Sequence, residues 1–155
     1  MEKVKLQAQY GLYINGEWRS ASDGATYNAE SPADGSHLAV CAQGTRKDVE
    51  AASAAAWEAF KTWKKTTSAQ RAALLNKIAD IIDANKEHLA MVESMDNGKP
   101  IRETMNVDIP MAAEHFRYFA GCILAEEGQA SVLNEQFLSI ILREPIGVVG
   151  QIIPW

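Results

Sequence analysis

The side chains that most often carry chemistry are sparse in this sequence. Its 155 residues contain two cysteines, Cys41 and Cys122, and three histidines, His37, His88 and His115. Two cysteines are too few for a disulfide framework or a zinc site, so the commoner role of each is a small buried hydrophobic residue. The histidines lack the spacing of metal ligands, and we expect them on the surface or in packing. These residues alone therefore predict no catalytic or metal centre.

The end of the sequence is its most informative stretch. Residues 144–155 read EPIGVVGQIIPW, and a shorter run, residues 137–143 (FLSIILR), predicts a strand that leads into them. The large apolar residues of the final run are Ile146, Val148, Val149, Ile152 and Ile153. Such a run is typical of a strand buried on both faces of a parallel sheet, which predicts an α/β fold. Parallel neighbours need long crossover connections, so we expect the sequence to stop where its main domain begins.

Composition excludes several functional classes. The sequence is 47% hydrophobic and 23% charged, which is ordinary for a globular protein. Its net charge of −5, from 15 basic and 20 acidic residues, leaves no broad basic field for nucleic acid or anionic lipid. The N-terminus lacks the apolar core of a signal peptide, and no window approaches the length of a membrane span. We therefore expect a cytoplasmic protein with no nucleic-acid or membrane partner.

The N-terminal part predicts short strands and turns. In residues 10–19, YGLYINGEWR, apolar and aromatic side chains flank Asn15-Gly16, a dipeptide that favours a tight hairpin turn. Residues 31–35, SPADG, are a second turn signal, and residues 37–42, HLAVCA, predict a further strand. The chain is therefore expected to begin with a β-hairpin and a separate strand.

The hydrophobic period becomes helical after these strands. Thr45 and Asp48 resemble a capping box ahead of an Ala-rich segment that ends near Trp63. Thr67 and Gln70 form a clearer capping box. The apolar residues that follow at helical spacing are Leu74, Leu75, Ile78, Ile81 and Ile82. The patterns predict two helices, and the second is expected to be amphipathic and to pack on a core.

Two more helical stretches follow. Residues 86–97 predict a third helix, which a glycine and a proline terminate. Residues 101–126 predict one long helix or two shorter ones, because Pro110 lacks a backbone donor. We expect Pro110 to kink the helix or to restart it, with Asp108 or Ile109 as the cap.

Five segments together resemble one known family. They are YINGEW, SPADG, ESMDNGKP, RYFAG and REPIGVVGQIIPW, in that order. The set is similar to the N-terminal part of NAD(P)-dependent aldehyde dehydrogenases, and the likeness covers the chain from Tyr10 onward. It implies that residues 1–155 are a partial coenzyme-binding domain, with a β-hairpin, a helical layer and the first strand of a Rossmann-like sheet. Residues 129–144 would belong to an arm used in oligomer assembly, and the catalytic domain would be absent.

The resemblance also implies a cofactor contact. Groups of the final segment line the coenzyme cleft in the family, which assigns cofactor binding to Ile152, Ile153, Pro154 and Trp155. Open α/β sheets bind ligands beyond the carboxyl ends of their strands, where these residues would lie. Core packing is the alternative for such apolar residues. The implied cofactor is NAD, with NADP as the alternative.

Two further sites follow from the resemblance. Val107 and Met111 match positions that line the aldehyde entrance tunnel in relatives, with core packing as the alternative. Asp96 matches a carboxylate that, in some relatives, holds a monovalent cation together with a backbone carbonyl near Ala29. The alternative for Asp96 is a capping or surface residue.

The family's central chemistry is expected outside this sequence. A Cys thiolate attacks the aldehyde to form a thiohemiacetal, hydride passes to the nicotinamide, and a Glu-assisted water releases the acid. The oxyanion-hole Asn follows the IIPW motif directly, one residue beyond Trp155. The nucleophile and base lie further on, so neither Cys41 nor Cys122 takes the nucleophile's role.

The resemblance therefore implies a function for a longer protein. We expect the N-terminal portion of an enzyme that oxidises small-molecule aldehydes to carboxylic acids, assembled as a homo-oligomer, a dimer or a tetramer. The portion alone is expected to be inactive. The alternative is a non-catalytic interaction or oligomerisation module derived from the same family.

Overall fold

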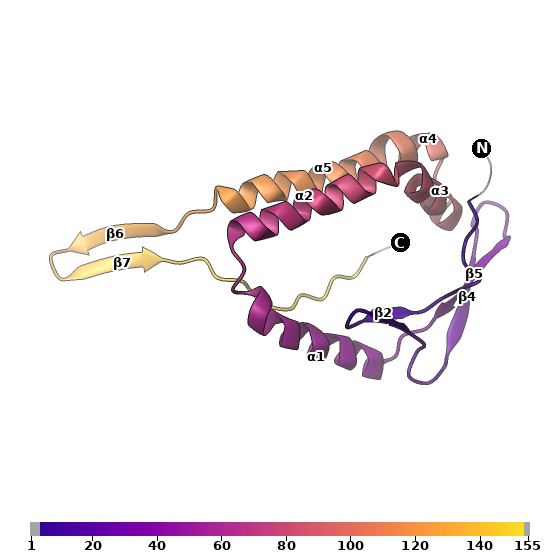
Figure 1. Cartoon of the computed structure of the whole chain (residues 1–155), viewed down its shortest axis with the longest axis horizontal. Coiled ribbons are helices and arrows are strands. Elements are labelled where there is room, and N and C mark those ends of the chain that lie inside the picture. The colour runs from indigo at the N-terminus through magenta and orange to yellow at the C-terminus, as the bar shows by residue number, and fades with distance from the viewer. Residues whose placement is uncertain (1–3, 154–155) are drawn as a thin grey trace.

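A layer of helices lies between small β elements at one end and a projecting β-hairpin at the other (Figure 1). The structure is a computed structural model that describes residues 4–153. Two long helices, α2 and α5, run antiparallel through the layer (Figure 1). The mixed α/β composition agrees with the predicted class.

Three short strands form a sheet in the order β1-β5-β4. β1 (Gln9–Tyr10) runs parallel to β5 (His37–Ala42), and β4 (Thr26–Glu30) pairs with β5 in the antiparallel direction. The strand predicted over residues 37–42 is confirmed as β5. The predicted turn at 31–35 joins it to β4, and the Gly35 amide donates to the Ser31 carbonyl at 2.8 Å. β4 itself is an additional strand.

The predicted hairpin is confirmed over residues 12–19. β2 (Leu12–Ile14) pairs antiparallel with β3 (Glu17–Arg19). Asn15 and Gly16 connect them with φ angles of 55° and 81°. Positive φ at both central residues is the geometry of a tight turn that matches strand twist, and this explains why Asn-Gly is found here.

Helix α1 (Arg46–Trp63) begins at the first predicted capping box. The Thr45 side chain accepts from the Asp48 amide, and the Asp48 carboxylate accepts from the Thr45 amide at 2.9 Å. Asp48 also accepts from the Ser22 amide at 3.1 Å, which ties α1 to the loop after β3. The hydrogen bonds from Thr45, and then those from Ser22, lower the pKa of Asp48 from 3.8 to about 2.

Helices α2 (Ser68–Ala84) and α5 (Ile109–Leu124) form the best-packed part of the layer. The second predicted capping box is confirmed, because the Thr67 side chain accepts from the Gln70 amide at 3.2 Å. The buried residues of the two helices are Ala72, Ala79, Ala113 and Ala120. Methyl side chains let helix axes approach closely, since interaxial distance depends on the side chains at the contact. The core of this layer is therefore built from small residues.

Helix α3 (Lys86–Asn97) confirms the third predicted helix. It ends at Gly98, whose φ of 76° is the left-handed conformation that glycine adopts freely at helix ends. A Cβ at this position would lie 3.0 Å from Cγ of Pro32. The end of α3 therefore packs closely against the turn after β4.

The chain is helical from residue 101 to 124, but the turn before Pro110 is wide. α4 (Ile101–Glu103) continues into the π-helical turn η1 (Thr104–Asp108) and then into α5. Pro110 would clash with the carbonyl four residues earlier in a regular α-helix, and a wider turn relieves that clash. Of the two predicted alternatives, a restart with a side-chain cap is not observed: Asp108 precedes α5, but it and Ile109 have helical φ and ψ, and the Asp108 side chain makes no capping bond.

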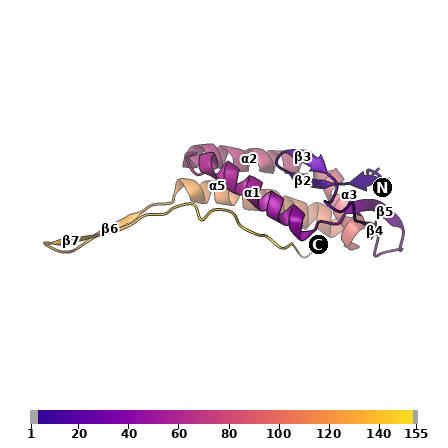
Figure 2. The same ribbon diagram turned by 90° about the horizontal axis from the view of Figure 1, so that it is seen from below.

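A two-stranded hairpin projects from the end of α5. β6 (Gln129–Asn134) pairs antiparallel with β7 (Phe137–Ile141), and the pair extends away from the other elements in both views (Figures 1 and 2). All of β6 is exposed, and in β7 only Ser139 is half-buried. The strand predicted over 137–143 is confirmed as β7, and β6 is an additional strand.

The final run differs from its prediction. Residues 144–153 form no strand, although the sequence predicts a buried one within 144–155, and the strand predicted over 137–143 ends at Ile141. Ile146 is 90% exposed and Ile152 is 99% exposed. A strand exists only where a neighbour supplies hydrogen bonds, and residues 4–153 offer this run no such neighbour. The run instead passes alongside α1 as an irregular segment (Figure 1).

Candidate functional site

Two of the four predicted cofactor residues, Ile152 and Ile153, belong to the described part of the chain and are largely uncovered. The Ile152 side chain is 99% exposed and that of Ile153 is 66% exposed, so almost no protein surrounds them. Pro154 and Trp155 lie outside the described residues. A coenzyme pocket encloses most of its ligand. Ile152 and Ile153 therefore fit a coenzyme only as one edge of its site, and residues 4–153 do not enclose it.

The terminal run is anchored on α1 at Gly147. This residue has φ of 112°, and a Cβ there would lie 2.8 Å from Cη2 of Trp57. A side chain at position 147 would thus collide with the indole and strain the backbone. Gly150, three residues later, has open space around it. Trp57 therefore sets the path by which the run approaches Ile152.

Val107 and Met111 occupy the turn around Pro110. Val107 belongs to η1 and Met111 to the first turn of α5. Their side chains are 41% and 48% exposed. The alternative of core packing does not apply within residues 4–153, and the assignment to an aldehyde tunnel remains a prediction.

Thr104 fastens this turn to α3. It is fully buried, and its hydroxyl lies 3.0 Å from the Ala90 carbonyl and 2.8 Å from the Ser94 hydroxyl. The Ile101 carbonyl lies 3.2 Å away. Sequence reasoning missed Thr104, because the only signal is one hydroxyl residue inside a predicted helix.

Asp96 and Ala29, the predicted cation ligands, lie on facing elements. Asp96 is near the end of α3, and Ala29 lies on β4. The Asp96 carboxylate is close enough to Tyr27, two residues before Ala29, to contribute to the raised pKa of that phenol, after burial and Cys41. Asp96 is exposed, and it lines a surface pocket with Pro32. A carboxylate and a carbonyl are suitable oxygen ligands, but they remain a predicted pair.

A charged cluster next to this pocket was not predicted. Lys99 pairs with Asp108 at 2.5 Å, which joins the loop after α3 to η1. The hydrogen bond to Asp108 raises the pKa of Lys99. Burial, and then the charge of Asp108, raise the pKa of Glu93. The cluster thus reinforces the same junction that Thr104 holds.

The cysteines do not form a nucleophilic pair with a base. Cys41 is half-buried on β5, where it contributes to the raised pKa of Tyr27. Cys122 is exposed, contrary to the buried role expected of a free cysteine, and its hydrogen bond raises the pKa of Tyr118. This face of α5 remains open because no described element covers it. All three histidines are exposed.

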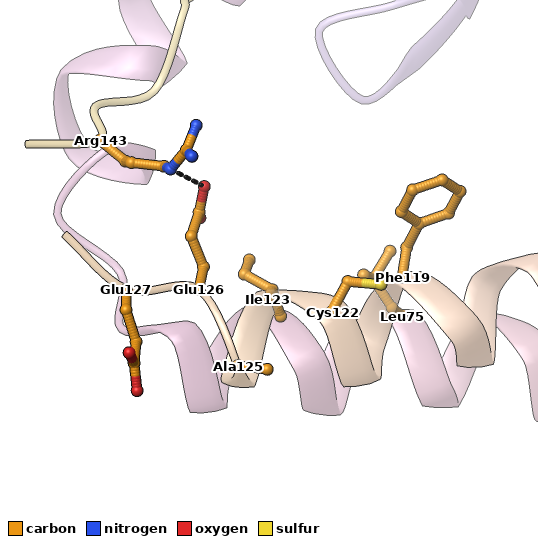
Figure 3. A pocket seen from close by; sticks show the side chains of 8 residues that line it. All are labelled: Leu75, Phe119, Cys122, Ile123, Ala125, Glu126, Glu127 and Arg143. Atoms are coloured by element: carbon orange, nitrogen blue, oxygen red, sulfur yellow. Dashed lines mark ion pairs between the residues drawn. The ribbon is translucent and has the colours of Figure 1, made fainter. Parts of the chain in front are cut away.

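A surface pocket lies where α5 leads into the hairpin (Figure 3). It has an apolar side on the helices and a charged side, where Arg143 lies 3.6 Å from Glu126. Its lining residues are Leu75, Phe119, Cys122, Ile123, Ala125, Glu126, Glu127 and Arg143. No sequence pattern predicts this pocket. Its apolar side is an uncovered helix surface rather than a catalytic arrangement.

No group of three or more His, Cys, Asp or Glu side chains in residues 4–153 is arranged to hold a metal ion. Across the same residues, no helix has both the length and the apolar character to cross a membrane.

Solved structures place this fold among aldehyde dehydrogenases. The crystal structure of PnpE from Pseudomonas sp. WBC-3 matches with a TM-score of 0.90 and 42% identity, over 95% of this chain and 30% of that one. The NAD-dependent aldehyde dehydrogenase from Sinorhizobium meliloti matches with a TM-score of 0.83 and 34% identity, over 88% of this chain and 28% of that one. Another structure of PnpE is a complex with nicotinamide adenine dinucleotide.

Sequence comparison agrees with the fold. The profile of the aldehyde dehydrogenase family matches residues 18–155. The EPTC-inducible aldehyde dehydrogenase of Rhodococcus erythropolis is 47% identical over 152 residues, covering 98% of this chain and 30% of the relative. An aldehyde dehydrogenase of Vibrio cholerae is 48% identical over 152 residues, which again cover 98% of this chain and 30% of the relative. The chain belongs to the aldehyde dehydrogenase family.

The chain spans about 30% of the length of these curated relatives. The predicted recognition, the N-terminal portion of an aldehyde dehydrogenase, is confirmed by the family match and by this coverage. The individual site residues remain predictions.

Proposed function

We propose that this chain is the N-terminal part of a subunit that oxidises aldehydes to carboxylic acids with NAD(P). The family match over residues 18–155 carries this proposal. The coenzyme in the PnpE complex supports NAD as the hydride acceptor, with NADP as the alternative. The aldehyde would be a small molecule, and the protein would act in the cytoplasm.

The chain's own residues contribute binding surfaces in this proposal. Ile152 and Ile153, together with Pro154 and Trp155, form one edge of the coenzyme site. Val107 and Met111 line the aldehyde tunnel, and Asp96 holds a monovalent cation with the Ala29 carbonyl. The exposure of Ile152, Val107 and Met111 supports these roles, because each side chain is free to contact a ligand or another part of the subunit.

The reacting groups come from the remainder of the subunit. The Cys of the remaining sequence would supply the thiolate that adds to the aldehyde carbon, and the Glu would activate the water that cleaves the resulting acyl thioester and returns the thiol. NAD(P), when bound, would accept the hydride. Cys41 and Cys122 do not serve as the nucleophile in this proposal, because the family's nucleophilic Cys lies further along the subunit. The 155-residue chain by itself is therefore inactive.

The same proposal covers domain organisation and assembly. Residues 1–155 are part of the coenzyme-binding domain, and residues 147–155 become the first strand of its Rossmann-like sheet. Residues 129–144 are part of the arm through which subunits assemble as a dimer or a tetramer. The exposed apolar side chains of β6 and β7 support this role, since an uncovered sheet pairs readily with another chain.

The test is NADH formation by the whole subunit. The gene that encodes this chain should continue with an Asn after Trp155 and, later, a Cys and a Glu. Its purified product should reduce NAD with an aldehyde, and the 155-residue chain should not. A continuation that lacks the Cys, or a whole product inactive with all aldehydes tried, would overturn the proposal.

A second candidate is a non-catalytic interaction or oligomerisation module of the same family. The projecting β6–β7 hairpin is the observation that favours it. A monodisperse 155-residue protein that melts cooperatively would support the module. Aggregation of the chain would support the enzyme portion instead, because exposed apolar strands promote association.

A further inference from the structure

We infer that Thr104 is a positioning residue that sets aldehyde selectivity by holding the π-helical turn that carries Val107. The inference rests on the proposed function, because it concerns the tunnel to which Val107 and Met111 are assigned. The residue itself touches neither substrate nor cofactor in this account. Its hydroxyl acts through the backbone of η1.

The hydrogen bonds of Thr104 have a defined direction. A Thr hydroxyl has one proton to donate, and carbonyl oxygens only accept. The proton therefore goes to the Ala90 carbonyl, 3.0 Å away, or to the Ile101 carbonyl, 3.2 Å away. The Ser94 hydroxyl, at 2.8 Å, must then donate to Thr104. The fully buried Thr104 hydroxyl thus acts both as a hydrogen-bond donor and as a hydrogen-bond acceptor.

These bonds join two helices at one point. Ala90 and Ser94 belong to α3, whereas Thr104 is the first residue of η1. The Thr104 carbonyl accepts from the Ile109 amide, which is the five-residue bond of a π turn. The Thr104 hydroxyl therefore attaches to α3 the residue at which the wide hydrogen-bond ring begins.

The width of this turn decides which side chains of η1 face outward. Each residue of an α-helix rotates the next by about 100°. A turn that closes over five residues instead of four contains one extra residue and so shifts everything after it by about that angle. Thr104 is buried and Val107 is 41% exposed in the observed register. Pro110 keeps the turn wide, so loss of the Thr104 anchor would leave the turn π-helical but free to shift against α3, and Val107 and Met111 would move with it.

Loss of the Thr104 hydroxyl should therefore change the positions of Val107 and Met111 in the tunnel and leave the reacting groups unchanged. Thr104→Val keeps the shape of the side chain but leaves the Ala90 carbonyl and the Ser94 hydroxyl without this partner. Thr104→Ser keeps the hydroxyl. Thr62→Val is the matched control, because Thr62 is exposed on α1 and its hydroxyl bonds only the Ala59 carbonyl, at 3.1 Å.

The experiment compares these variants in the whole subunit with straight-chain aldehydes of increasing length. We expect Thr104→Val to change the ratio of kcat/KM between a long and a short aldehyde by about tenfold, through KM, because small changes in an apolar pocket have effects of that size. Thr104→Ser and Thr62→Val should keep the ratio of the unmodified protein. An unchanged ratio in Thr104→Val would overturn the inference.

Hydrogen exchange supplies a readout that does not depend on activity. The Ile109 amide should exchange about tenfold faster in Thr104→Val than in Thr62→Val, because the local opening of the π turn becomes easier. An equal exchange rate in both variants would show that Thr104 does not hold the turn. If Thr104→Val fails to fold, Ser94→Ala replaces it and should shift the ratio in the same direction, and an unshifted ratio would overturn the inference. An unmodified subunit that oxidises no aldehyde would instead overturn the proposed function.

Discussion

The α2–α5 pair and the terminal run are both apolar, yet they end in opposite environments. Ala79 is fully buried and Ala120 is 2% exposed between the two helices. Ile146 and Ile152, which are larger and more hydrophobic, are 90% and 99% exposed in the terminal run. Burial therefore follows the presence of a packing partner rather than the hydrophobicity of the residue.

The two regions differ in how they satisfy their backbones. A helix closes its hydrogen bonds within one segment, so α2 and α5 need each other only for side-chain packing. A strand needs a neighbour for its backbone as well, and residues 144–153 have none among the described elements. The helices of the layer therefore satisfy their own backbones within this chain, whereas the terminal run lacks the neighbouring strands that the proposed subunit would supply.

The largest effect is expected from enlarging a buried alanine. Ala79→Leu places a larger side chain at a fully buried position between α2 and α5. We expect the free energy of unfolding to fall by about 1–3 kcal/mol, because a tightly packed core resists extra volume. Urea denaturation of the chain measures it.

Ala73→Leu is the matched control on the same helix, because Ala73 is exposed. It should change stability by less than about 0.5 kcal/mol, as substitutions on a surface usually do. Ile152→Ser should be similarly neutral in this chain. Equal losses for Ala79→Leu and Ala73→Leu would remove the contrast between the packed layer and the open run.

The next effect tests the contact between the terminal run and α1. Gly147→Ala should lower the free energy of unfolding by about 1 kcal/mol, since the new Cβ meets Trp57 and strains a positive φ. The loss cannot exceed the free energy that holds the run on α1. Gly150→Ala should have little effect, because that position is open. A double-mutant cycle with Trp57→Leu should give a coupling of at least about 0.5 kcal/mol.

The result of this cycle decides where the run lies. Gly147→Ala should become less harmful when Trp57 is already Leu, because only the backbone strain remains. If the effects of the two substitutions simply add, the run does not rest on the Trp57 side chain.

An acid-sensitive effect should appear at the start of α1. The folded-state pKa of Asp48 is about 2, below its ordinary value of 3.8. The unfolded chain thus binds the proton first as pH falls, so the stabilisation is complete above 3.8 and is lost as pH decreases toward 2. Asp48→Asn should weaken this pH dependence in thermal melts between those two values. An identical pH profile in both proteins would contradict the capping role.

The smallest effect concerns an exposed ion pair across the helical layer. Arg117 on α5 contacts Asp80 at 2.8 Å and Asp83 at 2.7 Å on α2. Arg117→Gln should reduce stability slightly at low salt and not at high salt, because salt screens exposed charges. Arg102→Gln is the control, since Arg102 pairs only with its neighbour Glu103. A loss that is independent of salt would mean that Arg117 acts by packing.

Local chemistry made much of the fold predictable. The Asn15-Gly16 turn and the capping boxes at Thr45 and Thr67 depend on residues within a few positions of each other. The structure confirms all three. The change from strands to helices near residue 45 was predictable for the same reason, because a capping box marks the start of the first helix.

Features that depend on distant partners could not be predicted in the same way. β4 forms because β5 pairs with it, and its segment TYNAE has no strong strand pattern of its own. The terminal run has a strong strand pattern but no partner strand. The π turn before Pro110 replaced the predicted cap because a wider turn relieves the clash without ending the helix.

The residues of the candidate site also fall into a group that the sequence indicated and a group that only the fold reveals. Val107, Met111, Asp96 and Ile152 came from resemblance to a family, and the structure adds their exposure and neighbours. Thr104 and the Lys99–Asp108 pair needed coordinates, because their partners lie on elements that only the fold brings together.

Hydrogen exchange of residues 144–153 tests the central claim most directly. The amides of this run should exchange rapidly in the 155-residue chain, where no neighbouring strand protects them. In the whole subunit the amides of residues 147–153 should be strongly protected, because we propose that they form part of the first strand of the coenzyme-binding sheet. Equally rapid exchange in both proteins would contradict the account.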